Sequence, residues 1–260
     1  MTDLLLERAG GVATLTLNRP ESMNSLSLAL KEHLLDAVAE LRADTTVRAV
    51  VLTGSGRGFC VGQDLREHVA ALDAGGAPLD TVTRHYNPIV TTLATLPVPV
   101  IAAVNGMAAG AGAGLAFACD FRLASSSAGF LIAFANVGLS LDSGVSWTLP
   151  RLVGFARATS LSLLAEPISA ESALQMGLVS AVVEPDRLLP AAHELAERLA
   201  AGPTRAYAAI KESIAFAANA TLADALAKEA DLQRDMGATA DHRNATAAFV
   251  AKQKPVFEGR

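Results

Sequence analysis

Twice in this chain, an apolar run typical of a buried strand leads into a glycine-rich loop and then into a helix. The first run spans residues 48–53 and its loop residues 54–62, and the second run spans residues 100–104 and its loop residues 105–114. Another strand pattern follows at residues 121–124, and helical patterns lie between the strands. Strands that alternate with helices in this way indicate an α/β fold.

The first hundred residues show clear local signals. Two alternating segments at residues 4–7 and 12–17, joined by glycines, predict a hairpin. Residues 27–41 carry apolar side chains at helical spacing, and Ser27 is the predicted N-cap of that helix. A second amphipathic helix is predicted at residues 81–96, where prolines follow.

The last part of the chain differs from the rest because residues 203–252 are predicted to be almost entirely helical. A chain of 260 residues fits one medium domain with a small appendage. We therefore expect a core over residues 1–200 and a helical C-terminal region over residues 201–260.

Composition excludes several classes of protein. Because 51% of the residues are hydrophobic and 18% are charged, the chain is not disordered. The net charge of −5, without a basic stripe, argues against a nucleic-acid partner. The longest apolar run, residues 98–118, is interrupted by proline, asparagine and glycines, so we expect no membrane partner.

The cysteines and the N-terminus point to one compartment. Cys60 and Cys119 are too few for a disulfide framework or a structural metal site, so we expect reduced thiols and no metal. The N-terminal segment lacks the basic region of a secretory signal. These features predict a cytoplasmic protein.

Three glycines at the predicted start of one helix, Gly110, Gly112 and Gly114, need an explanation, because each costs the helix about 1 kcal/mol relative to alanine. One explanation is a ligand that touches the bare backbone and takes the unpaired N–H groups of the first turn. Such N–H groups stabilise negative charge, and two that converge on one oxygen form an oxyanion hole. The other explanation is tight packing of the helix against a strand.

Several segments together carry a resemblance to a known family. Residues 18–26 (NRPESMNSL), 59–65 (FCVGQDL), 99–106 (PVIAAVNG) and 110–112 (GAG), followed by CD at 119–120, resemble the crotonase (enoyl-CoA hydratase/isomerase) superfamily in kind and in order. The resemblance extends into the last predicted helix. It implies a spiral of ββα units with a C-terminal helical trimerisation region, an acyl-CoA thioester as the substrate, and a homotrimer or dimer of trimers.

The same resemblance implies site residues. The backbone N–H groups of Gln63 and Ala111 would bind the thioester oxygen, with coenzyme A as part of the substrate and no separate cofactor. Arg66 would lie near the adenine and phosphates, together with two residues from a neighbouring subunit, Phe249 and Lys252. The full set of expected substrate and CoA contacts is Met23, Ser25, Val61, Gly62, Asp64, Leu65, Arg66, Gly110, Gly114, Phe134, Phe249 and Lys252.

The reaction is predicted from two positions where the sequence differs from the family's hydratases and one position where it matches the family's isomerases. Hydratases of the family place two glutamates around the substrate, and the matching positions here are Gly114 and Phe134, which cannot move a proton. Asp142 resembles the aspartate of the family's isomerases, and segments 86–88 and 147–151 are similar to the ring-1,2-epoxyphenylacetyl-CoA isomerases. We therefore expect an acyl-CoA isomerase in which Asp142 moves a proton beside a stabilised enolate.

Other interpretations remain open within the family. Asp142 is also a good N-cap for the helix that follows it. A hydratase with a relocated acid, a non-catalytic acyl-CoA binder, and a dehalogenase that uses Asp142 with His68 or His85 are the alternatives.

A short-chain dehydrogenase is the alternative outside the family. It is suggested by the glycines of residues 53–58 and by the spacing of Tyr207 and Lys211, although strands and a helix precede the loop where that fold would begin. The sequence does not identify the acyl group.

Overall fold

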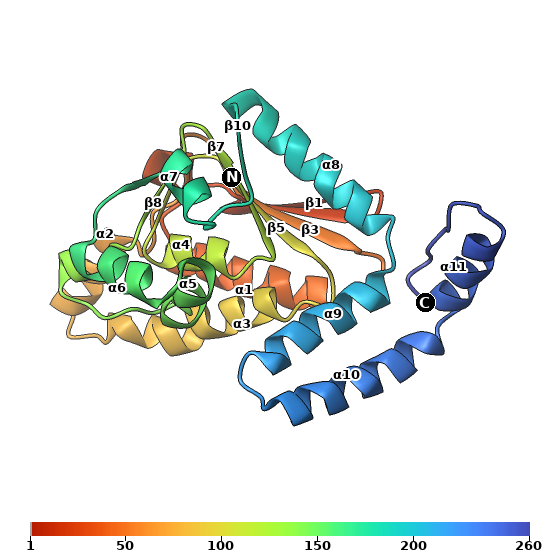
Figure 1. The fold of residues 1–260 in the computed structure, drawn as a ribbon. Coiled ribbons are helices and arrows are strands. Elements are labelled where there is room, and N and C mark those ends of the chain that lie inside the picture. Colours follow the sequence, from red (N-terminus) through yellow and green to blue (C-terminus); the bar gives the residue numbers. More distant parts are fainter. Residues whose placement is uncertain (1) are drawn as a thin grey trace.

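The structure is a computed structural model that describes residues 2–260. In this part of the chain the strands form two sheets (Figure 1). The larger sheet has the strand order β1 (Leu4–Ala9), β2 (Val12–Leu17), β3 (Ala49–Gly54), β5 (Val100–Val104), β7 (Phe121–Ser125) and β10 (Ala181–Val183). The smaller sheet has the order β4 (Gly58–Cys60), β6 (Met107–Ala109), β8 (Gly129–Leu131) and β9 (Ile168–Ser169). The β1–β2 hairpin and the β8–β9 pair are antiparallel, and the other pairs are parallel.

The chain passes repeatedly from the larger sheet to the smaller sheet and then into a helix. The first turn is β3, β4 and α2 (Leu65–Asp73), the second is β5, β6 and α4 (Ala111–Phe117), and the third is β7 and β8 followed by α5 (Val145–Val153). This repetition is the predicted spiral of ββα units, which is confirmed. One expectation was wrong in detail, because parts of both predicted loops are the short strands β4 and β6, whose three residues are too few to show a strand pattern in sequence.

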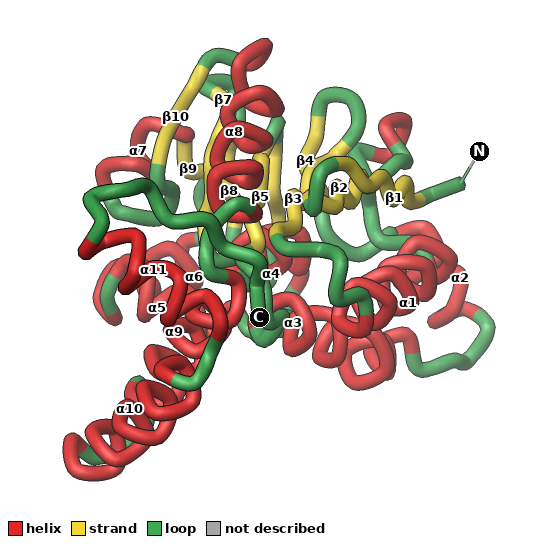
Figure 2. Tube along the Cα trace, turned by 90° about the vertical axis from the view of Figure 1, so that its right-hand side faces the viewer, coloured by secondary structure: helices red, strands yellow, loops and turns green. Residues whose placement is uncertain are grey.

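Both faces of the central strands β3 and β5 are buried, which explains why these two strands are almost continuously apolar. In β3, Val50 and Leu52 face one cluster with α1 (Leu28–Ala43), while Ala49 and Val51 face α8 (Leu188–Ala200). Figure 2 shows α8 along one side of the strands, with α1 and α3 on the other side.

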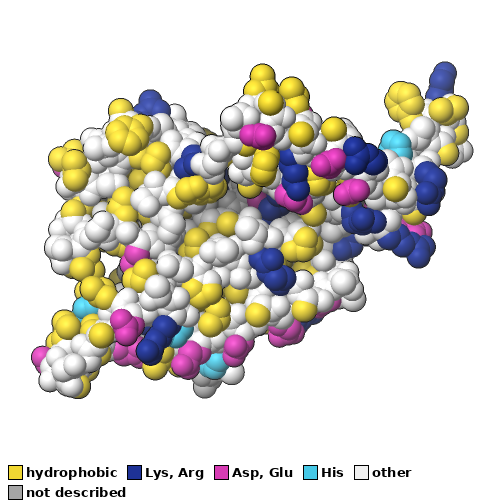
Figure 3. All heavy atoms as spheres, turned by 90° about the horizontal axis from the view of Figure 1, so that it is seen from below, with side chains coloured by type: hydrophobic (Ala, Val, Ile, Leu, Met, Phe, Trp, Pro, Cys, Tyr) yellow, Lys and Arg dark blue, Asp and Glu magenta, His cyan; other side chains and the backbone are white. Residues whose placement is uncertain are grey.

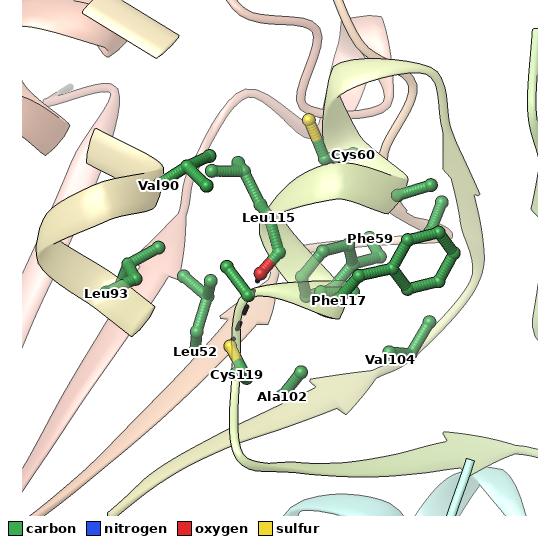
Figure 4. Close-up of a cluster of buried hydrophobic side chains, with 14 of the residues drawn as sticks. Leu52, Phe59, Cys60, Val90, Leu93, Ala102, Val104, Leu115, Phe117 and Cys119 are labelled. Atoms are coloured by element: carbon green, nitrogen blue, oxygen red, sulfur yellow. Dashed lines mark hydrogen bonds between the residues drawn. The ribbon is translucent and has the colours of Figure 1, made fainter. Parts of the chain in front are cut away.

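The larger cluster fills the space between the sheet and the helices beneath it. Figure 4 shows Leu52 and Ala102 from the sheet, Val90 and Leu93 from α3 (Asn87–Ala94), and Leu115 from α4 pointing into this space. In the same region the Phe117 and Phe130 rings stack with their centroids 5.9 Å apart. This packing fixes α4 against the sheet.

The predicted local signals are largely confirmed. The Ser27 side chain accepts a hydrogen bond from the Leu30 N–H and caps α1. The helix predicted at 81–96 begins as a π-helical turn, Val82–Tyr86, and continues as α3. The remaining helices of the core are α6 (Phe155–Leu164) and α7 (Ala170–Gln175).

The C-terminal region contains α9 (Thr204–Ala217), α10 (Leu222–Gly237) and α11 (Ala240–Val250). Figure 1 shows α10 and α11 extending away from the sheets. The first of these helices is tied to the core because the Lys211 ammonium lies 2.6 Å from the Asp120 carboxylate and donates to the Val98 carbonyl. Across residues 2–260, none of the helices combines the length and the apolar character that crossing a membrane requires.

Candidate active site

A pocket of about 320 Å³ lies beside the start of α4, between the two predicted glycine-rich loops and the π-helical turn Val82–Tyr86 that precedes α3. Its wall is mostly apolar, and its polar groups come from separate elements of the fold. The predicted residues that line it are Val61, Gly62, Gln63, Leu65, Gly110, Ala111, Phe134 and Asp142. The tertiary structure thus brings together residues as far apart in the chain as Val61 and Asp142.

The two loops touch each other at Gly62. This residue has a φ of +85°, in the left-handed region that favours glycine. A Cβ atom on Gly62 would lie 2.9 Å from the Ala109 carbonyl oxygen and 3.4 Å from the Ala111 nitrogen. The backbone at Gly62 therefore lies against the backbone at the start of α4.

The backbone N–H groups of Gln63 and Ala111 are both unpaired. Leu26 bonds to the residues on either side of Gln63, because it donates to the Gly62 oxygen at 2.7 Å and accepts from the Asp64 N–H at 3.3 Å. This parallel bridge leaves the Gln63 N–H directed away from Leu26. Ala111 begins α4, where the first N–H groups have no partner within the helix. Over residues 2–260, neither N–H has an acceptor within the chain.

The three glycines of the second loop have different surroundings. A Cβ on Gly112 would lie 2.1 Å from the Cys60 carbonyl oxygen, and a Cβ on Gly114 would lie 2.6 Å from the Ser143 Cβ. Gly110 has a φ of +52° and open space around it, and it lines the pocket. Packing therefore explains Gly112 and Gly114, whereas the left-handed φ explains Gly110. Gly114 faces the packed interior rather than the pocket.

Asp142 lies in the segment before α5 and does not cap that helix. The N-cap of α5 is Gly144, and no side chain caps the helix. The Asp142 carboxylate instead accepts a 2.7 Å hydrogen bond from the Ser143 hydroxyl. Burial raises the pKa of Asp142, and the hydrogen bond from Ser143 opposes this shift. The interpretation of Asp142 as an N-cap is therefore wrong, and its carboxyl group is part of the pocket wall.

Tyr86 is one of two polar pocket residues that sequence reasoning missed, and Thr81 is the other. Tyr86 is buried, and burial together with the nearby charge of Asp142 raises the pKa of its hydroxyl well above its usual value. The Tyr86 hydroxyl donates a hydrogen bond to the Gln63 side-chain oxygen, which also accepts from the Lys31 ammonium at 3.3 Å. Lys31 lies on the buried side of α1, four residues after Ser27 and three before Leu34. A lysine at a buried position of an amphipathic helix was the signal in the sequence that could have pointed to this group of polar residues.

A second hollow of about 700 Å³ adjoins the pocket and shares Val61, Gln63 and Leu65 with it. The predicted CoA contacts that line this hollow beyond the shared residues are Met23, Ser25, Asp64 and Arg66. We call this second hollow the entry groove.

Asp64 has a structural part in the entry groove. Its carboxylate accepts hydrogen bonds from the backbone N–H groups of Arg66 and Glu67, and so caps α2. It also accepts from Arg19 at 3.0 Å and from Ser25 at 3.1 Å. Burial opposes ionisation of Asp64, but the hydrogen bonds from Arg19 and Ser25 outweigh it and hold the pKa below its usual value.

The other predicted residues lie elsewhere. Phe249 is 83% exposed on α11, and Lys252 follows that helix, so neither meets the pocket within one chain. His68 lines the pocket, whereas the His85 ring bonds to the Thr81 hydroxyl at 3.0 Å. Lys211, which the dehydrogenase alternative would use, forms an ion pair with Asp120 away from the pocket.

Known proteins resemble this chain over nearly its whole length. The family model described as Enoyl-CoA hydratase/isomerase matches residues 7–260. The chain is 46% identical to the 1,2-epoxyphenylacetyl-CoA isomerase of Escherichia coli, over 96% of each chain. It is 44% identical to a protein of Rhodobacter capsulatus described as a probable enoyl-CoA hydratase, over 98% of this chain and 97% of the other. A crystal structure of a Mycobacterium abscessus protein described as an enoyl-CoA hydratase/isomerase superposes with a TM-score of 0.95 at 45% identity, covering 99% of this chain and 100% of that one.

Proposed function

The chain belongs to the enoyl-CoA hydratase/isomerase family, and from that membership we propose that it isomerises an acyl-CoA thioester by moving a proton with Asp142. The relatives include both isomerases and hydratases, so the choice between the two reactions depends on the pocket itself.

The observation that carries this choice is that Asp142 is the one carboxylate among the residues that line the pocket. Hydration by a pair of carboxylates needs one on each side of the substrate double bond. The hydratases that this sequence resembles have a glutamate at each of two positions, which are Gly114 and Phe134 here. Phe134 lines the pocket, and Ser143 packs against Gly114. A single carboxylate can remove a proton and return it at another carbon, which is an isomerisation.

The proposed mechanism uses the backbone and Asp142 in turn. The thioester oxygen accepts hydrogen bonds from the N–H groups of Gln63 and Ala111, which stabilise the enolate that forms when a proton leaves the α or γ carbon. Asp142 takes this proton and returns it at the other end of the conjugated system. Because its pKa is raised, Asp142 is a stronger base when ionised, and this favours the removal of a proton from carbon.

The coenzyme A portion of the substrate is proposed to lie in the entry groove. The groove is lined by Met23, Ser25 and Arg66, and it joins the pocket at Gln63. We propose that Phe249 and Lys252 reach the same coenzyme A from a neighbouring subunit, because both are exposed at the far end of the chain. No cofactor besides coenzyme A is needed for a proton transfer of this kind.

A homotrimer, or a dimer of trimers, is the assembly that we propose. The C-terminal helices expose large apolar side chains that a monomer leaves in water, among them Ile210, Ile214, Leu222, Leu226 and Val250. Figure 3 shows hydrophobic and basic side chains side by side over the right-hand part of the molecule, where these helices lie. Contact between subunits through this region would cover the apolar groups.

The test is isotope exchange with the wild type and Asp142→Asn. In deuterated water, the wild type should incorporate deuterium at the α or γ carbon of a 3-enoyl- or dienoyl-CoA, and the variant should lose turnover by roughly a thousandfold or more. Affinity for the acyl-CoA should stay within about twofold, since asparagine keeps the shape of the side chain.

Three outcomes would contradict the proposal. An active Asp142→Asn variant would remove Asp142 from the proton transfer. Rapid addition of water to a 2-enoyl-CoA by the wild type would assign the chain to the hydratases. Binding without exchange across a panel of acyl-CoAs would identify a passive binder.

A further inference from the structure

The Lys31 side chain is a buried positive charge that the proposed reaction does not use. Lys31 is 3% exposed, and across residues 2–260 no carboxylate lies within 4 Å of its ammonium. Its contacts are the Gln63 side-chain oxygen at 3.3 Å and the Tyr86 ring, whose centroid lies 5.7 Å away. Burial lowers the pKa of Lys31, and the charges of Glu67, Asp64 and Glu32 oppose this shift. A buried charge without a carboxylate in direct contact destabilises a fold, so this one needs another explanation.

The ammonium of Lys31 fixes the orientation of the Gln63 side-chain amide. An ammonium donates hydrogen bonds and cannot accept them, so the Gln63 atom that faces it must be the oxygen. The Tyr86 hydroxyl donates to the same oxygen. Two donors from two different helical segments therefore hold Oε1, and the planar amide places Nε2 on the opposite side.

The Gln63 Nε2 group has two donor hydrogens and no acceptor in the protein. Among residues 2–260, no hydrogen bond from Nε2 is present, although Gln63 uses its Oε1 twice. Among residues 2–260, the fully buried polar side-chain atoms without a partner do not include Nε2, so this group is not fully buried. Gln63 lies where the pocket and the entry groove meet. The open donor is therefore beside the space that the substrate would occupy.

We infer that Lys31 and Tyr86 lock the Gln63 amide so that its NH₂ group donates a hydrogen bond to a carbonyl oxygen of the bound acyl-CoA. Gln63 would then contact the substrate through its side chain as well as its backbone, and Lys31 is a positioning residue. Carbonyl oxygens at the junction of the two hollows come from two sources, the acyl thioester and the nearest amide of the pantetheine arm. The inference rests on the proposed acyl-CoA substrate.

The test compares Gln63→Glu with Lys31→Met. Glutamate keeps an oxygen toward Lys31 and Tyr86 and adds an ion pair with Lys31, so a purely structural role predicts an unchanged or higher Tm and unchanged function. The inference instead predicts that the Tm is kept while kcat/KM falls by roughly 10- to 100-fold, because an acceptor replaces the donor that faces the substrate. Lys31→Met should lower kcat/KM by about 3- to 10-fold, since the amide is freed to turn, without lowering the Tm.

Binding measurements separate the two sources of the carbonyl and keep this inference distinct from the proposed isomerase activity. Titration with free coenzyme A should show a weaker affinity for Gln63→Glu if the pantetheine amide is the acceptor. A loss confined to kcat, with coenzyme A affinity kept, identifies the thioester. Wild-type activity and coenzyme A affinity in Gln63→Glu would overturn the inference even if Asp142→Asn is inactive. Failure of the wild type to bind any acyl-CoA would instead overturn the proposed function.

Discussion

The carbonyl oxygen of Cys60 occupies the place that a side chain at Gly112 would need, 2.1 Å from its Cβ position. The β4 strand and the α4 helix thus approach each other through bare backbone. This contact holds Ala111, the first residue of the helix, beside the Gly62 turn, so the geometry of the proposed oxyanion hole depends on a packing contact one residue away.

We predict that Gly112→Ala lowers stability and activity together. The added methyl group must displace the Cys60 backbone, and overpacking of this kind costs about 1–3 kcal/mol or more. Thermal unfolding and turnover should therefore decline in parallel. Gly75→Ala is the control, since its surroundings are open and only its positive φ is strained. A Gly112→Ala variant with a wild-type Tm and no activity would show that the substrate, not Cys60, needs the space.

Asp142 should make the protein less stable as pH rises, and its removal should reverse this. In the folded chain, burial raises the pKa of Asp142 above its usual 3.8. Between 3.8 and that raised value, the folded chain keeps a proton that the unfolded chain has released, so stability falls with rising pH in this window. Asp142→Asn should therefore have a higher Tm than the wild type at pH 7, and the difference should vanish below pH 3.8. If the Tm of Asp142→Asn at pH 7 were equal to or lower than that of the wild type, burial would not destabilise the ionised Asp142 carboxylate.

The acid limb of the pH–rate profile should respond to Ser143. Because the base must be ionised, kcat/KM should fall as pH falls through the raised pKa of Asp142. The Ser143 hydroxyl lowers this pKa, so Ser143→Gly should move the limb to higher pH. Glycine suits the φ of +51° at this position, so the backbone is not strained by the change. A limb that does not move would show that another group sets it.

The Lys211–Asp120 pair should contribute to stability and not to turnover. Lys211→Met leaves the partly buried Asp120 carboxylate without its ammonium, and we expect a loss of about 1–3 kcal/mol with kcat within about twofold of the wild type. The double variant Lys211→Met, Asp120→Asn should lose less than the sum of the single changes. Loss of activity at an unchanged Tm would instead show that Lys211 takes part in turnover.

Lys252 should affect coenzyme A affinity only through an assembled neighbour. Lys252→Ala is expected to weaken acyl-CoA binding by about 2- to 5-fold and to reduce its dependence on salt, as is typical of one exposed charge. Lys254→Ala is the matched control. Sedimentation of both variants checks that the assembly is intact. Unchanged affinity and salt dependence would remove Lys252 from the site.

Sequence reasoning identified about half of the residues that line the pocket, because many of these lie in two short loops with strong local signals. Gly62, Gln63, Gly110 and Ala111 all follow buried strands, and parallel strands end at the same edge. Tyr86 was missed because it lies inside an amphipathic helical pattern, where an aromatic residue is usually part of the core.

The sequence by itself determined the alternation of strands and helices, the cap at Ser27, and the family, because these depend on neighbours a few positions apart and on the order of motifs. Only the tertiary structure decided that Gly112 and Gly114 serve packing, that Asp142 faces the pocket without capping α5, and that Lys31 meets Gln63. Each of these depends on contacts between residues distant in the chain, and burial, pKa and hydrogen-bond orientation are set by such contacts.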